Sequence, residues 1–355
     1  MISTRAEARP RHPTATVLIF RASMNSKPRV LVIGAGAVGQ VFGHHLIRAG
    51  ADVTFFVREA YRQTTARGFD MYGLRLLGSP EAIRVEGFGV VCTASEVAAK
   101  KFDQIYLALP SQAVTGTWLR DLVAVAGEAT WISIQPGPDD REALLKAGVD
   151  PQRLISGMLS LVSYPAPLPG ESPSRFPREG MAFWHPPLAS TLFSGPRERL
   201  EDVLSVLRRG GFPARRHADV HREVSFFTAV LLPYLAALEL SGWSLRKLVR
   251  GGGLQLGAAG AREASSIVAV AEGPKTPPAR IAGLASIVRL GLWWVSKVAP
   301  FPFEAYLRLH FTKTNAQTRF ILEALRGKAE ERGVAAPALH ELLAGRPRLE
   351  AEAGK

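Results

Sequence analysis

The spacing of hydrophobic residues changes once along the chain and divides it into two parts. In the first part, short apolar runs alternate with stretches whose apolar residues recur every three or four positions. The short runs predict buried strands and the longer spacing predicts helices. Their alternation is typical of a doubly wound parallel sheet. The predicted strands are Arg29–Ile33, Asp52–Val57, Phe102–Leu109 and Thr130–Ile134.

Three later stretches of the first part carry other patterns. Gly68–Leu77 and Ile83–Cys92 predict a β-hairpin excursion from the sheet, and residues 150–185 predict further strands around a proline-rich loop. An amphipathic helix over Glu198–Arg209 ends at a Gly-Gly stop signal.

From about residue 217 onward, long helical stretches replace the strands. They span Glu223–Leu240, Leu284–Val298 and Phe303–Arg332. The segment Ile281–Phe301 is very apolar, but Arg289 and Lys297 interrupt it, whereas a membrane-spanning helix needs about 20 largely uncharged residues. We expect a helix buried in the second part or at a dimer interface. A membrane-surface contact or an apolar substrate wall is the alternative.

The first strand leads directly into a glycine turn, and an apolar-periodic helix follows it. Gly34-x-Gly36-x-x-Gly39 between a strand and a helix is the fingerprint of dinucleotide binding. The first glycine allows the tight turn, the second lets a pyrophosphate approach the backbone, and the third lets the helix pack on the strand. The cofactor-binding residues that we predict here are Gly34, Ala35, Gly36, Ala37, Val38 and Gly39.

The end of the second strand indicates which dinucleotide is bound. An acidic residue there accepts hydrogen bonds from the ribose of NAD, while an arginine accommodates the 2′-phosphate of NADP. Arg58 comes first and Glu59 follows it. We therefore predict NADP, with Glu59 as the argument for NAD. Ser111, Gln112 and Gln135 follow the third and fourth strands and are expected to line the nicotinamide side of the cleft.

These patterns predict an α/β protein with an N-terminal Rossmann-type doubly wound parallel sheet followed by an all-α C-terminal domain. The expected divisions are a disordered extension (1–27), a dinucleotide-binding domain (28–215), a helical substrate or dimerisation domain (216–345) and a tail (346–355). Residues 1–23 also allow an over-long gene start or a transit peptide.

Composition narrows the function classes. With 47% hydrophobic and 21% charged residues the chain is globular, and its single cysteine excludes an internal disulfide framework and favours a reducing, cytoplasmic setting. The net charge of +13 attracts anions, and NADP is itself a polyanion. No nucleic-acid-binding signature is present, and we predict neither a nucleic-acid partner nor a metal site.

The chain resembles the ketopantoate reductase (2-dehydropantoate 2-reductase) family over about residues 28–345. The resemblance rests on the glycine fingerprint, Arg58, the segment Ile132–Gly137, and the C-terminal pair Ala316–Ile321 and Ala329–Pro337. It implies an NADP-binding domain, a helical substrate domain and hydride transfer to a 2-keto group between them.

The chain departs from the family where the family places its catalytic groups. Alignment on Pro233 puts Val224, Thr228 and Leu232 at the positions of the family's catalytic Lys and two Asn residues. Pro110-Ser111 replaces a Lys near the cofactor, Pro136 replaces an Asn, and Gln317 replaces a substrate-binding Glu. Reduction of a keto acid needs a proton donor and a positive charge for the carboxylate, so we expect a substrate other than ketopantoate.

Other polar residues offer replacements. Tyr306, His310, Lys313 and Gln317 have the spacing of one helix face, and the alternative is that this face is simply solvated. His310 or Lys313 would donate a proton, and Thr228 would hydrogen-bond a carbonyl. We expect an NADP-dependent reductase of a more apolar carbonyl compound. The alternative is a non-catalytic NADPH-binding sensor or scaffold. A homodimer is one option for assembly.

Overall fold

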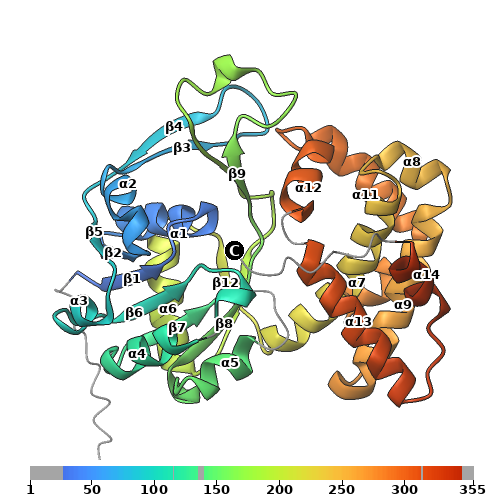
Figure 1. Cartoon of the computed structure of the whole chain (residues 1–355). Coiled ribbons are helices and arrows are strands. Elements are labelled where there is room, and N and C mark those ends of the chain that lie inside the picture. The colour runs from blue at the N-terminus through green and yellow to red at the C-terminus, as the bar shows by residue number, and fades with distance from the viewer. Residues whose placement is uncertain (1–26, 115, 135–139, 313–314, 346–355) are drawn as a thin grey trace, which may run out of the picture.

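The computed structural model describes residues 27–114, 116–134, 140–312 and 315–345 (Figure 1). The predicted tail and all but the last residue of the predicted extension lie outside these ranges.

The centre of the first part is an eight-stranded sheet with the order β12-β11-β8-β7-β6-β1-β2-β5. The strands from β5 to β8 in this order are parallel, and β11 runs antiparallel to β8. The prediction of a doubly wound parallel sheet is confirmed. The strands are β1 (Arg29–Ile33), β2 (Asp52–Phe56), β5 (Gly89–Val91), β6 (Gln104–Leu107), β7 (Thr130–Ser133), β8 (Leu154–Met158), β11 (Thr191–Ser194) and β12 (Ala214–Arg216).

Helices cover both faces of this sheet, which is why its strands read as continuous apolar runs. Val30 and Val32 of β1 face the layer formed by α1 and α6, while Leu31 and Ile33 face the layer formed by α3, α4 and α5. The helices of the first part are α1 (Ala37–Arg48), α2 (Arg62–Ala66), α3 (Ala94–Ala98), α4 (Thr117–Val125), α5 (Asp140–Lys146) and α6 (Arg197–Arg209).

A second, four-stranded sheet lies between the first sheet and the helical part (Figure 1). It has the order β4-β3-β10-β9, from β3 (Phe69–Gly73), β4 (Glu81–Val85), β9 (Val162–Ala166) and β10 (Gly180–Trp184). The hairpin of β3 and β4 was predicted. The inclusion of residues 89–92 in that hairpin is wrong, because Gly87 turns the chain with a φ of +78° and β5 then pairs with β2 of the large sheet.

The C-terminal part is helical, as predicted, and its centre is the contact between α7 and α9. Glycines of α9 let these helices approach closely: a Cβ on Gly257 would lie 2.7 Å from Tyr234 of α7, and one on Gly260 would lie 3.0 Å from Pro233 of α7. The helices are α7 (Val220–Leu240), α8 (Leu245–Arg250), α9 (Gly253–Glu272), α10 (Pro277–Ala282), α11 (Ala285–Val298), α12 (Phe303–Thr312), α13 (Asn315–Glu331) and α14 (Pro337–Ala344).

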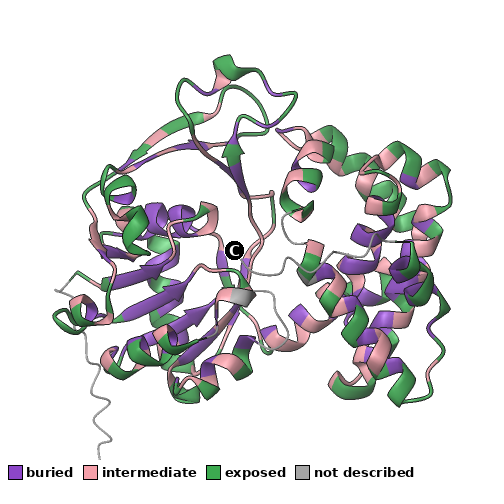
Figure 2. Cartoon of the chain, viewed as in Figure 1, coloured by how far each residue is buried: buried purple, intermediate pink, exposed green. Residues whose placement is uncertain are grey.

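One prediction for this part needs correction, and one is only partly covered by the structure. The helix predicted over residues 303–332 is described as α12 and α13, and residues 313–314 between them lie outside the described ranges. The apolar helix α11 is not buried in the helical part, because none of its residues is buried (Figure 2). It packs on the helical core only through a half-buried face that includes Val288 and Leu292.

Among the described residues, only α7 is long and apolar enough to cross a membrane, and 61% of that apolar stretch is buried inside the protein. We therefore assign α7 as a core helix.

Candidate dinucleotide-binding site

The turn between β1 and α1 is built by the glycines of the fingerprint. Gly34 has a φ of +97°, which glycine adopts without strain, and its N–H donates to the carbonyl oxygen of Phe56 at 2.9 Å. A Cβ on Gly39 would overlap the carbonyl oxygen of Gly34. The third glycine is therefore required for the contact between the first turn of α1 and the end of β1.

The middle glycine faces open space instead. Gly36 is exposed, precedes α1 in an extended conformation, and a Cβ on it would meet nothing within 4 Å. No side chain caps α1 and its first turn holds no acidic residue, so its free N–H groups and partial positive charge face outward. The Gln40 side chain braces this turn by donating to the carbonyl oxygen of Ala35 at 2.9 Å. This arrangement suits a phosphate group.

The end of β2 contributes a positive charge beside this turn. Arg58 is exposed, lies with its guanidinium carbon 4.9 Å from the ring centroid of Tyr61, and donates to the Tyr61 hydroxyl at 3.1 Å. In the part of the chain that the structure describes, Arg58 forms no ion pair with a carboxylate. Sequence reasoning missed Tyr61, although a spacing of three residues from Arg58 allows the two side chains to meet across one turn of the chain.

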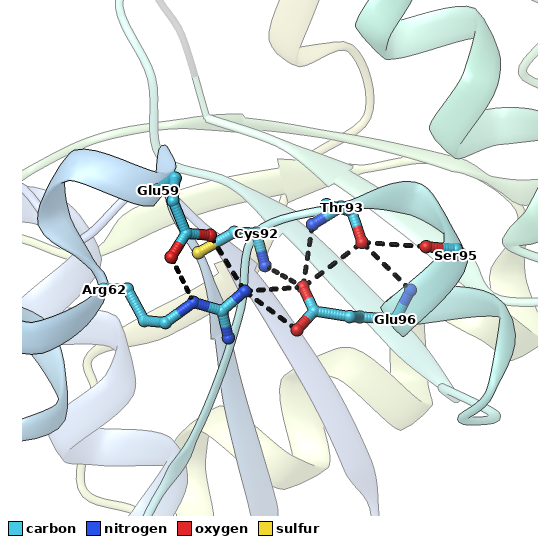
Figure 3. Close-up of polar contacts among 6 residues, drawn as sticks. All are labelled: Glu59, Arg62, Cys92, Thr93, Ser95 and Glu96. Carbon is cyan, nitrogen blue, oxygen red and sulfur yellow. Dashed lines mark hydrogen bonds and ion pairs between the residues drawn. The ribbon is translucent and has the colours of Figure 1, made fainter.

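The neighbouring carboxylate of Glu59 is engaged elsewhere (Figure 3). Arg62 donates to Glu59 at 2.8 and 3.0 Å and to Glu96 at 2.8 and 3.0 Å, so one guanidinium bridges two carboxylates. The hydrogen bond from Arg62 is the main cause that lowers the pKa of Glu59. Glu59 is thus held by a cation, whereas Arg58 is not paired with an anion.

Glu96 fixes the end of β5 in the same network. Its carboxylate accepts from the N–H groups of Cys92 at 2.6 Å and Thr93 at 3.0 Å, and it completes a capping box at the start of α3 (Figure 3). The bond from the Cys92 N–H, followed by that from Arg62, lowers the pKa of Glu96 to about 2. The network ties the segment after β2 to the edge strand of the sheet.

Of the residues predicted for the nicotinamide side, Ser111 can be placed. It follows β6, the neighbour of β1 on the side opposite β2, and its hydroxyl donates to the carboxylate of Asp140 at 2.8 Å. This bond links the end of β6 to the start of α5. Gln135 and the side chain of Gln112 lie outside the described residues.

The candidate proton donors lie on the helical part. On α7, Val224 and Leu232 are buried and Thr228 between them is half-buried. On α12, the Tyr306 side chain packs against Tyr164 and Phe301 in the core, so it is not part of a solvated polar face.

His310 is exposed and stacks on the Tyr306 ring at a centroid distance of 5.4 Å. Lys313 and the side chain of Gln317 lie outside the described residues. Tyr306 and His310 are therefore brought together, and the rest of their predicted row lies outside the described residues.

A cavity of about 380 Å³ adjoins α7 at the edge of the large sheet. Strands β1, β6, β7 and β8 are parallel, so the residues that follow β8 share the sheet edge with the glycine turn. The cavity and Arg58 thus lie on opposite sides of the turn. The lining is mostly apolar, with Arg215 as its one charged residue: Met158–Val162, Pro186, Leu188–Ser190, Leu192, Arg215 and Phe227. The Phe226-Phe227 pair already indicates an apolar cleft from the sequence, but the other lining residues were missed, because no local signal joins them.

A larger cavity of about 700 Å³ lies at the other end of α7, between Lys247, Gly251–Gly253 and Glu341. The sheet edge is the better candidate for a cofactor cleft despite the difference in volume, because the uncapped helix and the exposed glycine are found there.

Comparison with known proteins agrees with this geometry. Residues 30–164 match the family model described as Ketopantoate reductase PanE/ApbA. Comparison with curated protein sequences gives no match. The chain is similar in structure to a PanE/ApbA family ketopantoate reductase from Ralstonia eutropha JMP134, with a TM-score of 0.65 and 16% identity, covering 89% of this chain and 96% of that one.

Two further solved structures are similar. A 2-dehydropantoate 2-reductase from Geobacter metallireducens GS-15 has a TM-score of 0.60 and 15% identity, covering 89% of this chain and 98% of that one. A D-mandelate dehydrogenase solved with NADH and anilino(oxo)acetate has a TM-score of 0.64 and 14% identity, covering 89% of this chain and 96% of that one. Residues 30–164 therefore carry a domain of the ketopantoate reductase PanE/ApbA family, and the described part of the chain as a whole has the ketopantoate reductase fold.

Proposed function

We propose that the protein is an NADP-dependent reductase of an apolar carbonyl compound. The observation that carries the proposal is Gly36, which is exposed, precedes an uncapped helix, and leaves open the space into which a pyrophosphate would fit. The residues proposed to hold the cofactor are Gly34, Ala35, Gly36, Ala37, Val38, Gly39, Arg58, Ser111 and Gln135.

The preference for NADP over NAD rests on the residues after β2. The carboxylate of Glu59 is already bound by Arg62, which weakens its role as an acceptor for the ribose hydroxyls. Arg58 is exposed and held by Tyr61, so its guanidinium is oriented at little entropic cost to a bound 2′-phosphate.

The substrate class follows from the cavity beside Phe227. When bound, reduced nicotinamide supplies a hydride to the carbonyl carbon of the substrate. The chain has to exclude water, orient the carbonyl group and deliver a proton to its oxygen. The largely apolar lining of the cavity favours an apolar substrate. Thr228 is proposed to hydrogen-bond the carbonyl oxygen, with His310 and Lys313 as candidates for the proton donor.

The cofactor site is tested by a matched pair of glycine substitutions. A Cβ at Gly36 and one at Gly327 on α13 would each meet nothing within 4 Å, so neither Gly36→Ala nor Gly327→Ala should lower the Tm. Gly327→Ala should raise it slightly, because alanine favours the helix interior over glycine. Only Gly36→Ala places a methyl group where the pyrophosphate would lie. We expect it to weaken NADPH binding at least tenfold by fluorescence titration, a loss of about 1.4 kcal/mol or more. Equal NADPH affinities for the two variants would refute the site.

A second titration tests the choice of cofactor. Arg58→Ala removes a charge-assisted contact worth about 1.5–3 kcal/mol, so NADPH binding should weaken on the order of 10- to 100-fold. NADH binding should change little, because it lacks the 2′-phosphate. An equal effect on both cofactors would remove the argument for NADP.

The reaction is tested by a screen of apolar 2-keto acids, ketones and aldehydes for NADPH oxidation. A wild-type protein that binds NADPH but turns over none of them is not the proposed reductase.

A further inference from the structure

Helix α11 is apolar on its outer surface as well as on its inner one. Its inner face, which includes Val288 and Leu292, packs on the helical core. Its outer surface presents Leu290, Trp293 and Trp294, which are 65%, 60% and 53% exposed. Leu284 and Ile287 extend this surface toward the start of the helix. We call these five exposed residues the α11 apolar face.

The size of this face is that of an interaction site. With tryptophan side chains that each bury about 150–250 Å² when fully covered, the five residues together leave roughly a few hundred Å² of apolar surface in water. This is the size of the largest apolar patch on a typical monomer, and such a patch is often functional. A stable dimer buries about 800 Å² per partner, so the α11 apolar face is small for self-association.

The charges on α11 and on the chain segments directly before and after it are all of one sign. Between Glu272 and Glu304 the chain contains Lys275, Arg280, Arg289 and Lys297 and no acidic residue. Arg289 and Lys297 are exposed on α11 itself. A second copy placed symmetrically on this face would bring like charges together. An anionic surface would attract them, and each cation near such a surface contributes about fivefold to binding.

We propose that α11 docks on the surface of an anionic lipid bilayer. Its 14 residues span about 21 Å, too short to cross a hydrocarbon core of about 30 Å, so the helix lies in the plane of the interface. Trp293 and Trp294 sit at the level of the lipid headgroups, where indole rings are enriched, and Leu290 enters the acyl boundary. This placement brings an apolar substrate dissolved in the bilayer close to the protein, but the docking itself does not depend on the proposed reductase activity.

The test is co-sedimentation of the full chain with vesicles. We expect binding to vesicles of equal parts phosphatidylglycerol and phosphatidylcholine, and little binding to phosphatidylcholine alone. Salt at about 0.5 M should release the protein, because it screens the charges. Trp293→Ser/Trp294→Ser should lower partitioning at least tenfold, and Arg289→Gln/Lys297→Gln should lower it about 30-fold. The matched control is Phe320→Ser, which removes an aromatic side chain that is 65% exposed on α13 and should bind as the wild type does.

Three results would overturn the proposal. The first is no binding to anionic vesicles at low salt. The second is binding that the tryptophan variant and Phe320→Ser reduce equally. The third is a dimer, detected by light scattering, that Trp293→Ser/Trp294→Ser dissociates while neither protein binds vesicles. NADPH titration of the tryptophan variant checks that the protein is folded, because the cofactor site does not contact α11 in the proposal.

Discussion

Three histidines at the junction of α1, β10 and α6 are predicted to make the protein sensitive to mild acid. The Nδ1 atom of His45 lies 2.9 Å from the carbonyl oxygen of Gly210, and its Nε2 atom lies 3.1 Å from Nε2 of His185. A carbonyl oxygen only accepts, so Nδ1 of His45 carries the proton and its Nε2 accepts from His185. Burial lowers the pKa of both rings, so both are neutral in the folded protein at pH 7. His44 packs edge-on against His45.

The size of the effect follows from the pKa values. Burial lowers the pKa of His45 from 6.5 to about 3 and that of His185 from 6.5 to about 4. As the pH falls below 6.5, the unfolded chain binds protons that the folded protein does not, so stability is lost on acidification. Each pKa unit is worth about 1.4 kcal/mol, so His45 alone should cost about 2 kcal/mol of unfolding free energy by about pH 5.

The carboxylates whose pKa is lowered in the folded protein do not obscure this window. The usual pKa of Glu96 is 4.5 and is lowered to about 2 in the folded protein, so the stability that it contributes is lost only below 4.5. The range from pH 6.5 to about 5 therefore reports on the histidines.

Urea unfolding at about pH 7.5 and pH 5, followed by circular dichroism, measures the effect. His45→Gln keeps a donor for Gly210 and an acceptor for His185 but does not titrate. Its loss of unfolding free energy between the two pH values should be about 2 kcal/mol smaller than that of the wild type. The control is His340→Gln on α14, whose side chain is 53% exposed. The reasoning is refuted if His45→Gln loses as much stability on acidification as the wild type.

Two further predictions concern the cofactor domain. Gly39→Ala should lower the unfolding free energy by about 2–3 kcal/mol, because the new Cβ would overlap the carbonyl oxygen of Gly34 and push α1 away from β1. Thermal unfolding beside Gly327→Ala checks this, and equal Tm values would contradict it. Glu96→Gln should lower the Tm at neutral pH, and its difference from the wild type should shrink as the pH falls from 4.5 toward 2, where wild-type Glu96 becomes protonated. A difference that is independent of pH would show that the charge of Glu96 is not what stabilises α3.

The parts of the fold that the sequence predicts are those with local signals. The β1–α1 unit is an apolar run, a glycine turn and a periodic helix in one contiguous stretch, and its bounds were predicted closely. The helix α6 and the core helix α7 have equally local patterns. Each of these elements can be recognised without knowing what it packs against.

The missed elements depend on distant partners. β3 pairs with β10, so that Met71 lies opposite Met181, more than a hundred residues away. A hydrophobic pattern predicts a strand but does not select such a partner. The pattern also does not predict α9, because Gly257 and Gly260 read as helix breakers. In the structure the same glycines make room for Tyr234 and Leu342, and this benefit becomes visible only when α7 and α14 are in place.

The same distinction separates the two halves of the candidate site. The phosphate-binding half lies within one strand-turn-helix unit, so its fingerprint is readable and its glycines have little freedom to change. The cavity half is assembled from the β8–β9 connection, the loop before β11, Arg215 on β12 and Phe227 on α7. None of these segments constrains the others in sequence. On α7, buried Val224 and Leu232 now occupy the positions that the resemblance assigns to the family's Lys and Asn residues. The residues that line the cavity can therefore change while the glycine turn stays recognisable. For this reason the glycine motif supports a class of cofactor, whereas the argument for a substrate rests on the cavity.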